Sequence, residues 1–153
     1  MLPHLHSLVL FNTWANHKVV ESLKSCAEMP EMGVTLFSHI LQNNWYVLDL
    51  IEERDATGWY DAADYDFATC VAEIPKIEAA YQKLLAGLTE EQLAYSIRYT
   101  DFAGKQVTRR VSDMVFHTFD HCTYHRGQIA TLVRQAGGEP AKTWFNRWIS
   151  ETR

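Results

Sequence analysis

The sequence predicts an all-α fold, a four-helix bundle with a small β-hairpin before the last long helix. Four stretches, each long enough for about five turns, carry apolar side chains at the three- and four-residue spacing of an amphipathic helix. Proline, glycine or polar residues interrupt this pattern between the stretches. No internal repeat, low-complexity tract or linker divides the chain, so residues 1–153 are expected to form a single helical-bundle domain.

The first two helices are predicted over residues 5–26 and 35–53. In the first, the apolar residues at helical spacing are Leu8, Phe11, Ala15, Val19 and Leu23. The stretch Met29 to Gly33, which contains Pro30, ends this helix. In the second, the residues near one face are Leu36, Ile40, Val47 and Ile51, and His39 and Asn43 adjoin them. Residues 54–66 then follow as a loop.

A third helix is predicted over residues 68–88. Proline is tolerated in a first turn and kinks a helix interior, so Pro75 indicates either a start near it or a kink. Both readings remain open at this point. Residues 93–99 and 105–110 have β-compatible sequences on either side of an Asp-Phe-Ala-Gly turn, which indicates a short hairpin.

The last long helix is predicted over residues 113–136, with Ser112 as its N-cap. Two glycines and Pro140 end it. A short final helix is expected to carry Trp144, Phe145 and Trp148. The four long helices can therefore bury one common apolar interior.

Composition excludes several classes of protein. The net charge of −5 argues against a nucleic-acid-binding surface, which needs clustered Lys and Arg. The chain has three cysteines and no C-x-x-C pair, which fits free thiols in a reducing compartment. No apolar run reaches membrane-spanning length, and the N-terminus has no secretory pattern. We therefore expect a cytoplasmic protein without a nucleic-acid or membrane partner.

A histidine pattern on the last long helix is the strongest functional feature. His121 and His125 lie four residues apart, so both imidazoles can bind one metal ion from one helix face. They belong to a stripe that is predicted to face the bundle interior, formed by Met114, Thr118, His121, His125, Gln128 and Leu132. His39 on the second helix is a natural third ligand. Three imidazoles suit Zn, Ni or Fe, and leave a coordination position open.

Other interpretations of these residues remain open. The histidines can instead be core residues bonded to carbonyls or Tyr hydroxyls, and His117 forms a rival pair with His121. Gln128 either orients a metal ligand, contacts substrate or fills a polar gap. Arg126 either binds an anionic substrate group or pairs with an acidic neighbour. We name Arg126 and Gln128 as the candidate substrate-binding residues.

Several motifs together resemble a known family. The run from His121 to Ile129, H-C-T-Y-H-R-G-Q-I, resembles the H-x-x-x-H-R-G-Q-[IV] signature of the DinB/YfiT-like superfamily. Three further segments are similar to its other motifs, Phe11–Asn16 in the first helix, Phe37–Leu41 in the second, and Leu132–Gly137 at the end of the last long helix. The resemblance extends over nearly the whole chain and keeps the order of the predicted helices.

The resemblance implies an up-down-down-up bundle and a divalent metal ion, most often Ni or Zn, with Fe or Mn as further choices. Its ligands correspond to His39, His121 and His125 here. Some relatives are metal-dependent transferases that use a low-molecular-weight thiol such as bacillithiol or mycothiol, others are glutathione-dependent isomerases, and many form homodimers. We therefore expect a thiol S-transferase-like enzyme acting on an electrophilic small molecule. The alternative is a non-catalytic protein of the stress response that binds a metal or small molecule.

Two positions depart from the family pattern. Relatives often have Asp five residues after the second-helix histidine, where this chain has Asn44. An acidic neighbour of the metal, and with it a general base, is then missing. This makes hydrolysis by a metal-bound hydroxide the weaker third hypothesis. The segment after Pro140 is aromatic rather than Asp-rich, which favours core packing, with a dimer interface as the other possibility.

Overall fold

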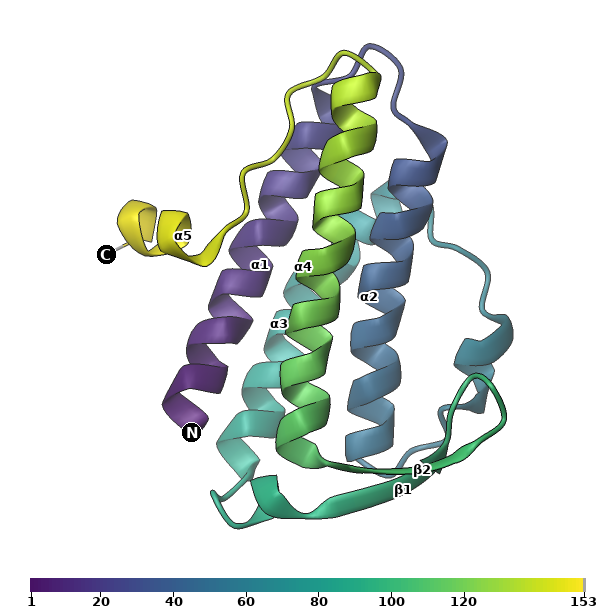
Figure 1. Ribbon diagram of the computed structural model, residues 1–153, viewed down its shortest axis with the longest axis vertical. Coiled ribbons are helices and arrows are strands. Elements are labelled where there is room, and N and C mark those ends of the chain that lie inside the picture. The colour runs from purple at the N-terminus through teal and green to yellow at the C-terminus, as the bar shows by residue number, and fades with distance from the viewer. Residues whose placement is uncertain (153) are drawn as a thin grey trace.

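The computed structural model describes residues 1–152 and confirms the predicted helical fold (Figure 1). Its elements in order are α1 (Leu2–Lys24), α2 (Glu31–Ile51), the 3-10 helix η1 (Thr57–Asp61), α3 (Phe67–Gly87), the 3-10 helix η2 (Gln92–Ala94), β1 (Ser96–Thr100), β2 (Gln106–Arg110), α4 (Val111–Gln135) and α5 (Phe145–Thr152). The four long helices form the bundle, and the hairpin precedes the last of them.

The bundle has the up-down-down-up order. In Figure 1, α1 and α4 run from the lower end to the upper end, and α2 and α3 run downward. The long connection between α2 and α3 returns the chain to the upper end, which makes these two consecutive helices parallel. Helix α4 packs against both α1 and α2. One helix therefore forms two separate seams, one with each neighbour.

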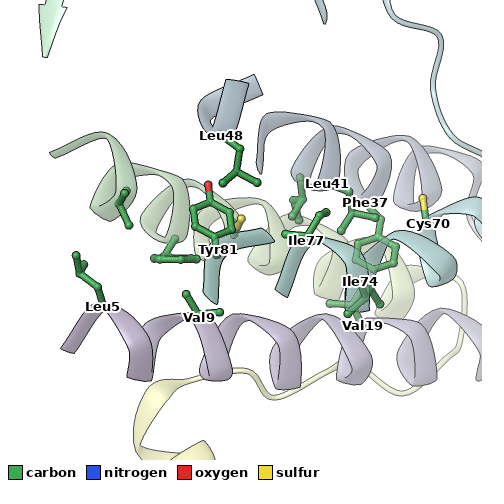
Figure 2. Packing of buried hydrophobic residues seen from close by; sticks show 14 of the residues in the cluster. Leu5, Val9, Val19, Phe37, Leu41, Leu48, Cys70, Ile74, Ile77 and Tyr81 are labelled. Atoms are coloured by element: carbon green, nitrogen blue, oxygen red, sulfur yellow. The ribbon is translucent and has the colours of Figure 1, made fainter. Parts of the chain in front are cut away.

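The core lies along the axis of the bundle. Figure 2 shows Val19, Phe37 and Ile74 meeting from three helices, with Leu41 and Tyr81 further along the same interior. All five side chains are at most 1% exposed. Full burial of each such side chain contributes roughly 1.5–3 kcal/mol, so this core fixes the relative positions of the helices.

The start of α3 agrees with the predicted helix and decides between the two interpretations of Pro75, whereas the start of α4 differs from its predicted cap. Helix α3 begins at Phe67, where Asp66 accepts a hydrogen bond from the Thr69 amide at 2.7 Å, so Pro75 lies inside the helix rather than at its start. Helix α4 begins at Val111 without a side-chain cap, because β2 leads directly into it. The prediction of Ser112 as N-cap is therefore wrong, since this serine lies in the first turn.

The hairpin crosses the lower end of the bundle (Figure 1). Its strands pair antiparallel, with Ser96 opposite Arg110 and Thr100 opposite Gln106. The Asp101 carboxylate closes the turn by accepting hydrogen bonds from two backbone amides, at 3.0 and 2.9 Å. Gly104 has a φ of +75°, the left-handed conformation that favours glycine. The turn therefore holds the residue at its tip, Phe102, at a defined place beside α2.

The C-terminal aromatics divide between core and surface. Trp148 on α5 is 5% exposed and packs with Phe11 and Ala15 of α1. Trp144 precedes the helix and is 56% exposed. The predicted core packing is thus confirmed for Trp148 but not for Trp144. Within residues 1–152, no helix has the length and apolar character needed to cross a membrane.

Candidate metal centre

Three histidine side chains converge between α2 and α4. The Nε2 atom of His121 lies 3.3 Å from Nε2 of His39 and 3.0 Å from Nε2 of His125. One nitrogen from each of the three rings lies within 4.8 Å of the other two. Residues 82 positions apart in sequence meet here because α2 and α4 pack side by side and run in opposite directions.

The histidines lie at the edge of the buried face of α4, not at its centre. The centre of that face is formed by Val115, Phe119, Cys122, Arg126, Ile129 and Val133, all at most 3% exposed. His121 and His125 are half-buried, and His39 is exposed. The predicted inward stripe is therefore buried at Met114 and Thr118, but from His121 onward the buried face is displaced by one residue, and Gln128 is exposed. This displacement leaves the imidazole nitrogens accessible from outside the bundle.

The surroundings keep two of the rings neutral. Burial, and then the neighbouring His125, His39 and His117, lower the pKa of His121 to about 4. Burial and His125 also lower the pKa of His39, against a smaller opposing effect of Asp64. Neutral imidazole is the form that binds metal ions, so the site favours the metal-binding state at neutral pH.

The three nitrogens fit a divalent ion. Two nitrogens bound at 2.0–2.1 Å to one tetrahedral ion lie roughly 3.4 Å apart, and neighbouring nitrogens around an octahedral ion lie roughly 3.0 Å apart. The two separations from His121, 3.3 and 3.0 Å, match these spacings, and the remaining pair, His39 and His125, has nitrogens within 4.8 Å. The Nε2 atom of His121 can donate at most one hydrogen, which cannot bond to both neighbouring nitrogens at once. A shared cation satisfies all three lone pairs together.

Gln128 supports one of the three rings. Its Oε1 atom lies 2.6 Å from Nδ1 of His125. If Nδ1 carries the hydrogen and donates it to the amide oxygen, the lone pair of Nε2 faces the other two histidines. Of the roles open to Gln128 in sequence, the geometry favours orienting a ligand. Nδ1 of His121, by contrast, is buried without a hydrogen-bond partner among residues 1–152.

Arg126 does not join the histidines, although it follows His125 directly. Its side chain is 1% exposed and lies between α4 and α1. The Nη1 atom donates to the amide oxygens of Asn12 at 2.7 Å and Asn16 at 3.1 Å. The Nη2 atom donates to the Thr123 hydroxyl at 3.0 Å. The guanidinium also lies 5.5 Å from the ring centre of Phe11. Arg126 therefore pairs with neutral oxygen atoms rather than with the acidic neighbour suggested by the sequence. It also does not lie at an exposed site for an anion.

Asn44 also points away from the histidines. It is fully buried, and its Nδ2 donates to the Ile40 carbonyl at 2.6 Å and to the sulfur of Cys122 at 3.3 Å. Position 44 thus lies in the core among α2, α3 and α4. The prediction that the metal has no acidic neighbour at this position stays a prediction, and the structure adds that Asn44 bonds within the core to Ile40 and Cys122.

A pocket of about 550 Å³ opens beside His39 and His121. Its walls come from α2, α4 and the hairpin, and they comprise His39, Asn43, Tyr46, Val47, Tyr99, Asp101, Phe102, Arg109, Asp113, Met114, His117 and His121. Of the other lining residues, the sequence places Met114 on the same stripe as His121, and Asn43 and Val47 near the face of the second helix that carries His39. The hairpin residues carry no local pattern that predicts this role, because only the packing of the hairpin against α2 brings them here.

Comparisons with known proteins agree with this architecture. A sequence model of the DinB family matches residues 35–152. The chain is similar to Protein DinB of Bacillus subtilis (strain 168), with 27% identity over 162 residues that cover 94% of this chain and 92% of that protein.

The fold is similar to the crystal structure of a DinB-like protein from Bacillus cereus ATCC 10987. The TM-score is 0.62 at 20% identity, over 88% of this chain and 92% of that chain. At this identity the similarity concerns the fold alone. The sequence match extends over most of the chain, and it includes the run from His121 to Ile129 that suggested the family. This chain belongs to the DinB family.

Proposed function

We propose that the chain binds one divalent metal ion through His39, His121 and His125. The convergence of three imidazole nitrogens within 4.8 Å carries this proposal. Imidazole donors favour Zn, Ni or Fe over Mg or Ca, and the family resemblance keeps Mn as a further choice. Gln128 orients His125 from behind. Arg126 is buried and stabilises the seam with α1, so this proposal assigns substrate contact to the pocket residues instead.

We further propose that the metal-loaded protein transfers a low-molecular-weight thiol to an electrophilic small molecule. A bound divalent ion lowers the pKa of a coordinated thiol and so supplies a thiolate nucleophile at neutral pH. In the overall reaction, a carbon–sulfur bond forms, the bond from that carbon to the leaving group breaks, and the thiol proton leaves with the departing anion. Three neutral histidines leave the site positively charged, which favours the thiolate.

The chain's own residues have two tasks in this reaction. The histidines, each neutral, hold the ion at the rim of the bundle, where one side stays open. The adjacent pocket can place the electrophile beside them. Its proximity to the histidines favours a transferase over the alternative, a non-catalytic protein that binds a metal or small molecule.

The location and the assembly are parts of the same proposal. Thiol cosubstrates are abundant in reducing compartments, and Cys26, Cys70 and Cys122 are all free thiols here. Both facts favour the cytoplasm. Exposed aromatic side chains on α4, such as Phe116 and Tyr124, favour a homodimer, since large exposed apolar groups often mark interfaces. Light scattering with size-exclusion chromatography measures the assembly directly.

Metal analysis of untagged protein is the first test. We expect one Zn or Ni ion per chain, and none in His121→Ala. His117→Ala is the matched control, because this exposed histidine lies one turn away on α4 and outside the cluster. Equal metal content in His121→Ala and wild type would contradict the proposed ligand set.

The second test measures conjugation. Metal-loaded protein is mixed with bacillithiol, mycothiol or glutathione and with chlorodinitrobenzene. We expect one thiol to give a conjugate at a rate well above that of His121→Ala, while exposed His17→Ala on α1 behaves as wild type. A stoichiometric metal ion without conjugation for any thiol would support the non-catalytic alternative.

A further inference from the structure

Two hydrogen-bond donors in the pocket beside the histidines make no hydrogen bond of normal geometry within residues 1–152, although the Tyr60 hydroxyl interacts with one of them, Tyr46. They are Nδ2 of Asn43 and the hydroxyl of Tyr46, both buried. Tyr46 is only 5% exposed. Its neighbour Tyr60 donates its own hydroxyl hydrogen to the Thr100 carbonyl at 2.6 Å. A buried donor without a normal hydrogen bond lowers the stability of the fold, so two of them in one pocket indicate a ligand that accepts hydrogen bonds.

The two donors and a candidate metal ligand form one row along α2. His39, Asn43 and Tyr46 are spaced by four and three residues, which places them on the same helix face. All three line the pocket. An oxygen atom bound by Asn43 and Tyr46 therefore lies next to the histidine cluster. Burial, and then Tyr60, Tyr99 and Asp101, raise the pKa of Tyr46 above its ordinary value, so its hydroxyl keeps the hydrogen that it donates.

The opposite wall of the pocket is aromatic. The ring of Phe102, at the tip of the hairpin, lies 4.7 Å from that of Tyr46 and 4.9 Å from that of Tyr60, measured between centroids. The ring of Tyr99 lies 6.5 Å from Tyr46 at an interplanar angle of 77°. Phe102 is nevertheless 61% exposed. A flat, unsaturated ligand can stack on these rings and cover the exposed face of Phe102.

The charged groups around the pocket allow an anion. Arg109 lines it and forms no ion pair with any carboxylate in residues 1–152. Asp101 is already engaged by two backbone amides of the turn. Asp113 lies in the first turn of α4, where the helix dipole stabilises it, but Asp101 and Asp113 both line the pocket, so the anionic group of a ligand is expected on the Arg109 side. His117 is the remaining titratable group, apart from the histidine cluster and the tyrosines.

We propose that this pocket binds a small aromatic or conjugated carboxylate, with its oxygens accepting from Asn43 and Tyr46 and its ring against Phe102 and Tyr99. In the thiol transfer this ligand also carries the electrophilic carbon and its leaving group, while the carboxylate serves only to bind it; this part rests on the proposed function. Binding itself does not depend on a metal, because both donors and the aromatic wall belong to the chain.

The test uses cinnamate as the probe, with isothermal titration of metal-free protein. Metal-free protein is necessary because a carboxylate can also coordinate a bound ion. We expect saturable binding at one site per chain. 3-Cyclohexylpropanoate, which keeps the charge but not the planar ring, and cinnamyl alcohol, which keeps the ring but not the charge, are each expected to bind at least tenfold more weakly.

Tyr46→Phe and Asn43→Leu remove one donor each with little change of shape. Each is expected to weaken cinnamate binding roughly tenfold, since a hydrogen bond to a charged group is lost. The melting temperature of metal-free Tyr46→Phe should equal or exceed that of wild type, because a buried hydroxyl without a normal hydrogen bond has been removed. Tyr60→Phe is the matched control, since its hydroxyl is bonded to the backbone, and it should bind cinnamate as wild type does.

The outcomes separate this inference from the proposed function. If metal-free protein does not bind cinnamate, or if both donor variants bind it as wild type does, the pocket assignment is overturned. This holds even where thiol conjugation is observed. If cinnamate binding requires Tyr46, but the protein neither holds a metal ion nor conjugates any thiol, the pocket assignment is supported and only the transfer reaction is overturned.

Discussion

The two seams of α4 use polar side chains in opposite ways. Towards α1, Arg126 is buried, and three oxygen atoms accept hydrogen bonds from its two terminal nitrogens. Towards α2, His121 and His125 lie with His39 at a rim, where their nitrogens face one another. The two sets are adjacent in sequence, since Arg126 follows His125 directly.

This difference separates a structural polar cluster from a functional one. On the α1 side the protein supplies nearly all of the partners itself; the one exception is the Nε hydrogen of Arg126. On the α2 side the donor and acceptor groups cannot satisfy one another, and a pocket opens next to them. Polar groups that the fold leaves unsatisfied in an accessible place indicate a ligand.

The largest expected effect comes from disrupting the α1 seam. Arg126→Ala leaves the amide oxygens of Asn12 and Asn16 without their donor and creates a cavity. We expect a loss of about 3–5 kcal/mol in the free energy of unfolding, measured by urea denaturation of metal-free protein. Arg134→Ala, an exposed arginine on the same helix, should change the stability by less than about 0.5 kcal/mol. A near-neutral Arg126→Ala would show that the α1 seam is not a structural cluster.

The second effect tests the α2 seam by adding and removing metal. Free Zn at 100 times its Kd should stabilise the protein by about 2.7 kcal/mol, because the folded state binds the ion. A chelator should reverse the gain, as measured by calorimetric melting. His39→Ala should show little of it, while His117→Ala should behave as wild type. Equal stabilisation of His39→Ala would remove this histidine from the site.

The third effect concerns the support behind His125. Gln128→Leu removes the oxygen that accepts from Nδ1. We expect metal affinity to fall roughly 10- to 100-fold, as is usual for such partners. Competition with a chromophoric chelator measures this change. Because Gln128 is exposed, the metal-free variant should melt at nearly the wild-type temperature. A parallel loss of stability would instead place Gln128 among the structural residues.

The smallest expected effect is the response of metal-free protein to acid. The pKa of His121 is about 4 in the folded state, against about 6.5 in the unfolded chain. Between these values the unfolded state binds a proton that the folded state does not. Stability therefore falls as the pH drops from 6.5 towards 4. Urea midpoints across this range measure the slope, which should be smaller in His121→Gln. An unchanged slope would assign the acid response to other groups.

The spacing of apolar residues predicts the four long helices, because each helix must present an apolar face to one common core. The long helix of residues 68–88 is placed well, although only the structure shows that Pro75 lies inside it. Ser112 was misassigned because a strand enters α4 directly, which no local capping pattern reveals. Local spacing therefore determines the elements better than it determines their ends.

The candidate site could be predicted only in part. Spacing pairs His121 with His125, the place of His39 on the second helix makes it the third candidate ligand, and the family resemblance implies the same three residues. The partners of Arg126 and Asn44 were not predictable, because they depend on which neighbour each face of α4 meets. The same holds for the pocket, because Phe102 in the hairpin turn meets Tyr46 on α2 only through tertiary packing.

The adjacency of His125 and Arg126 also restricts how the length of α4 can vary. Successive residues of a helix are rotated by about 100°. One residue inserted between Phe119 and His121 would turn all following side chains by that angle relative to the preceding turns. The arginine would then lose its amide partners in the same event that moves the imidazoles away from α2. Natural relatives with this double arrangement should therefore tolerate insertions in the hairpin turn but not in this helical run.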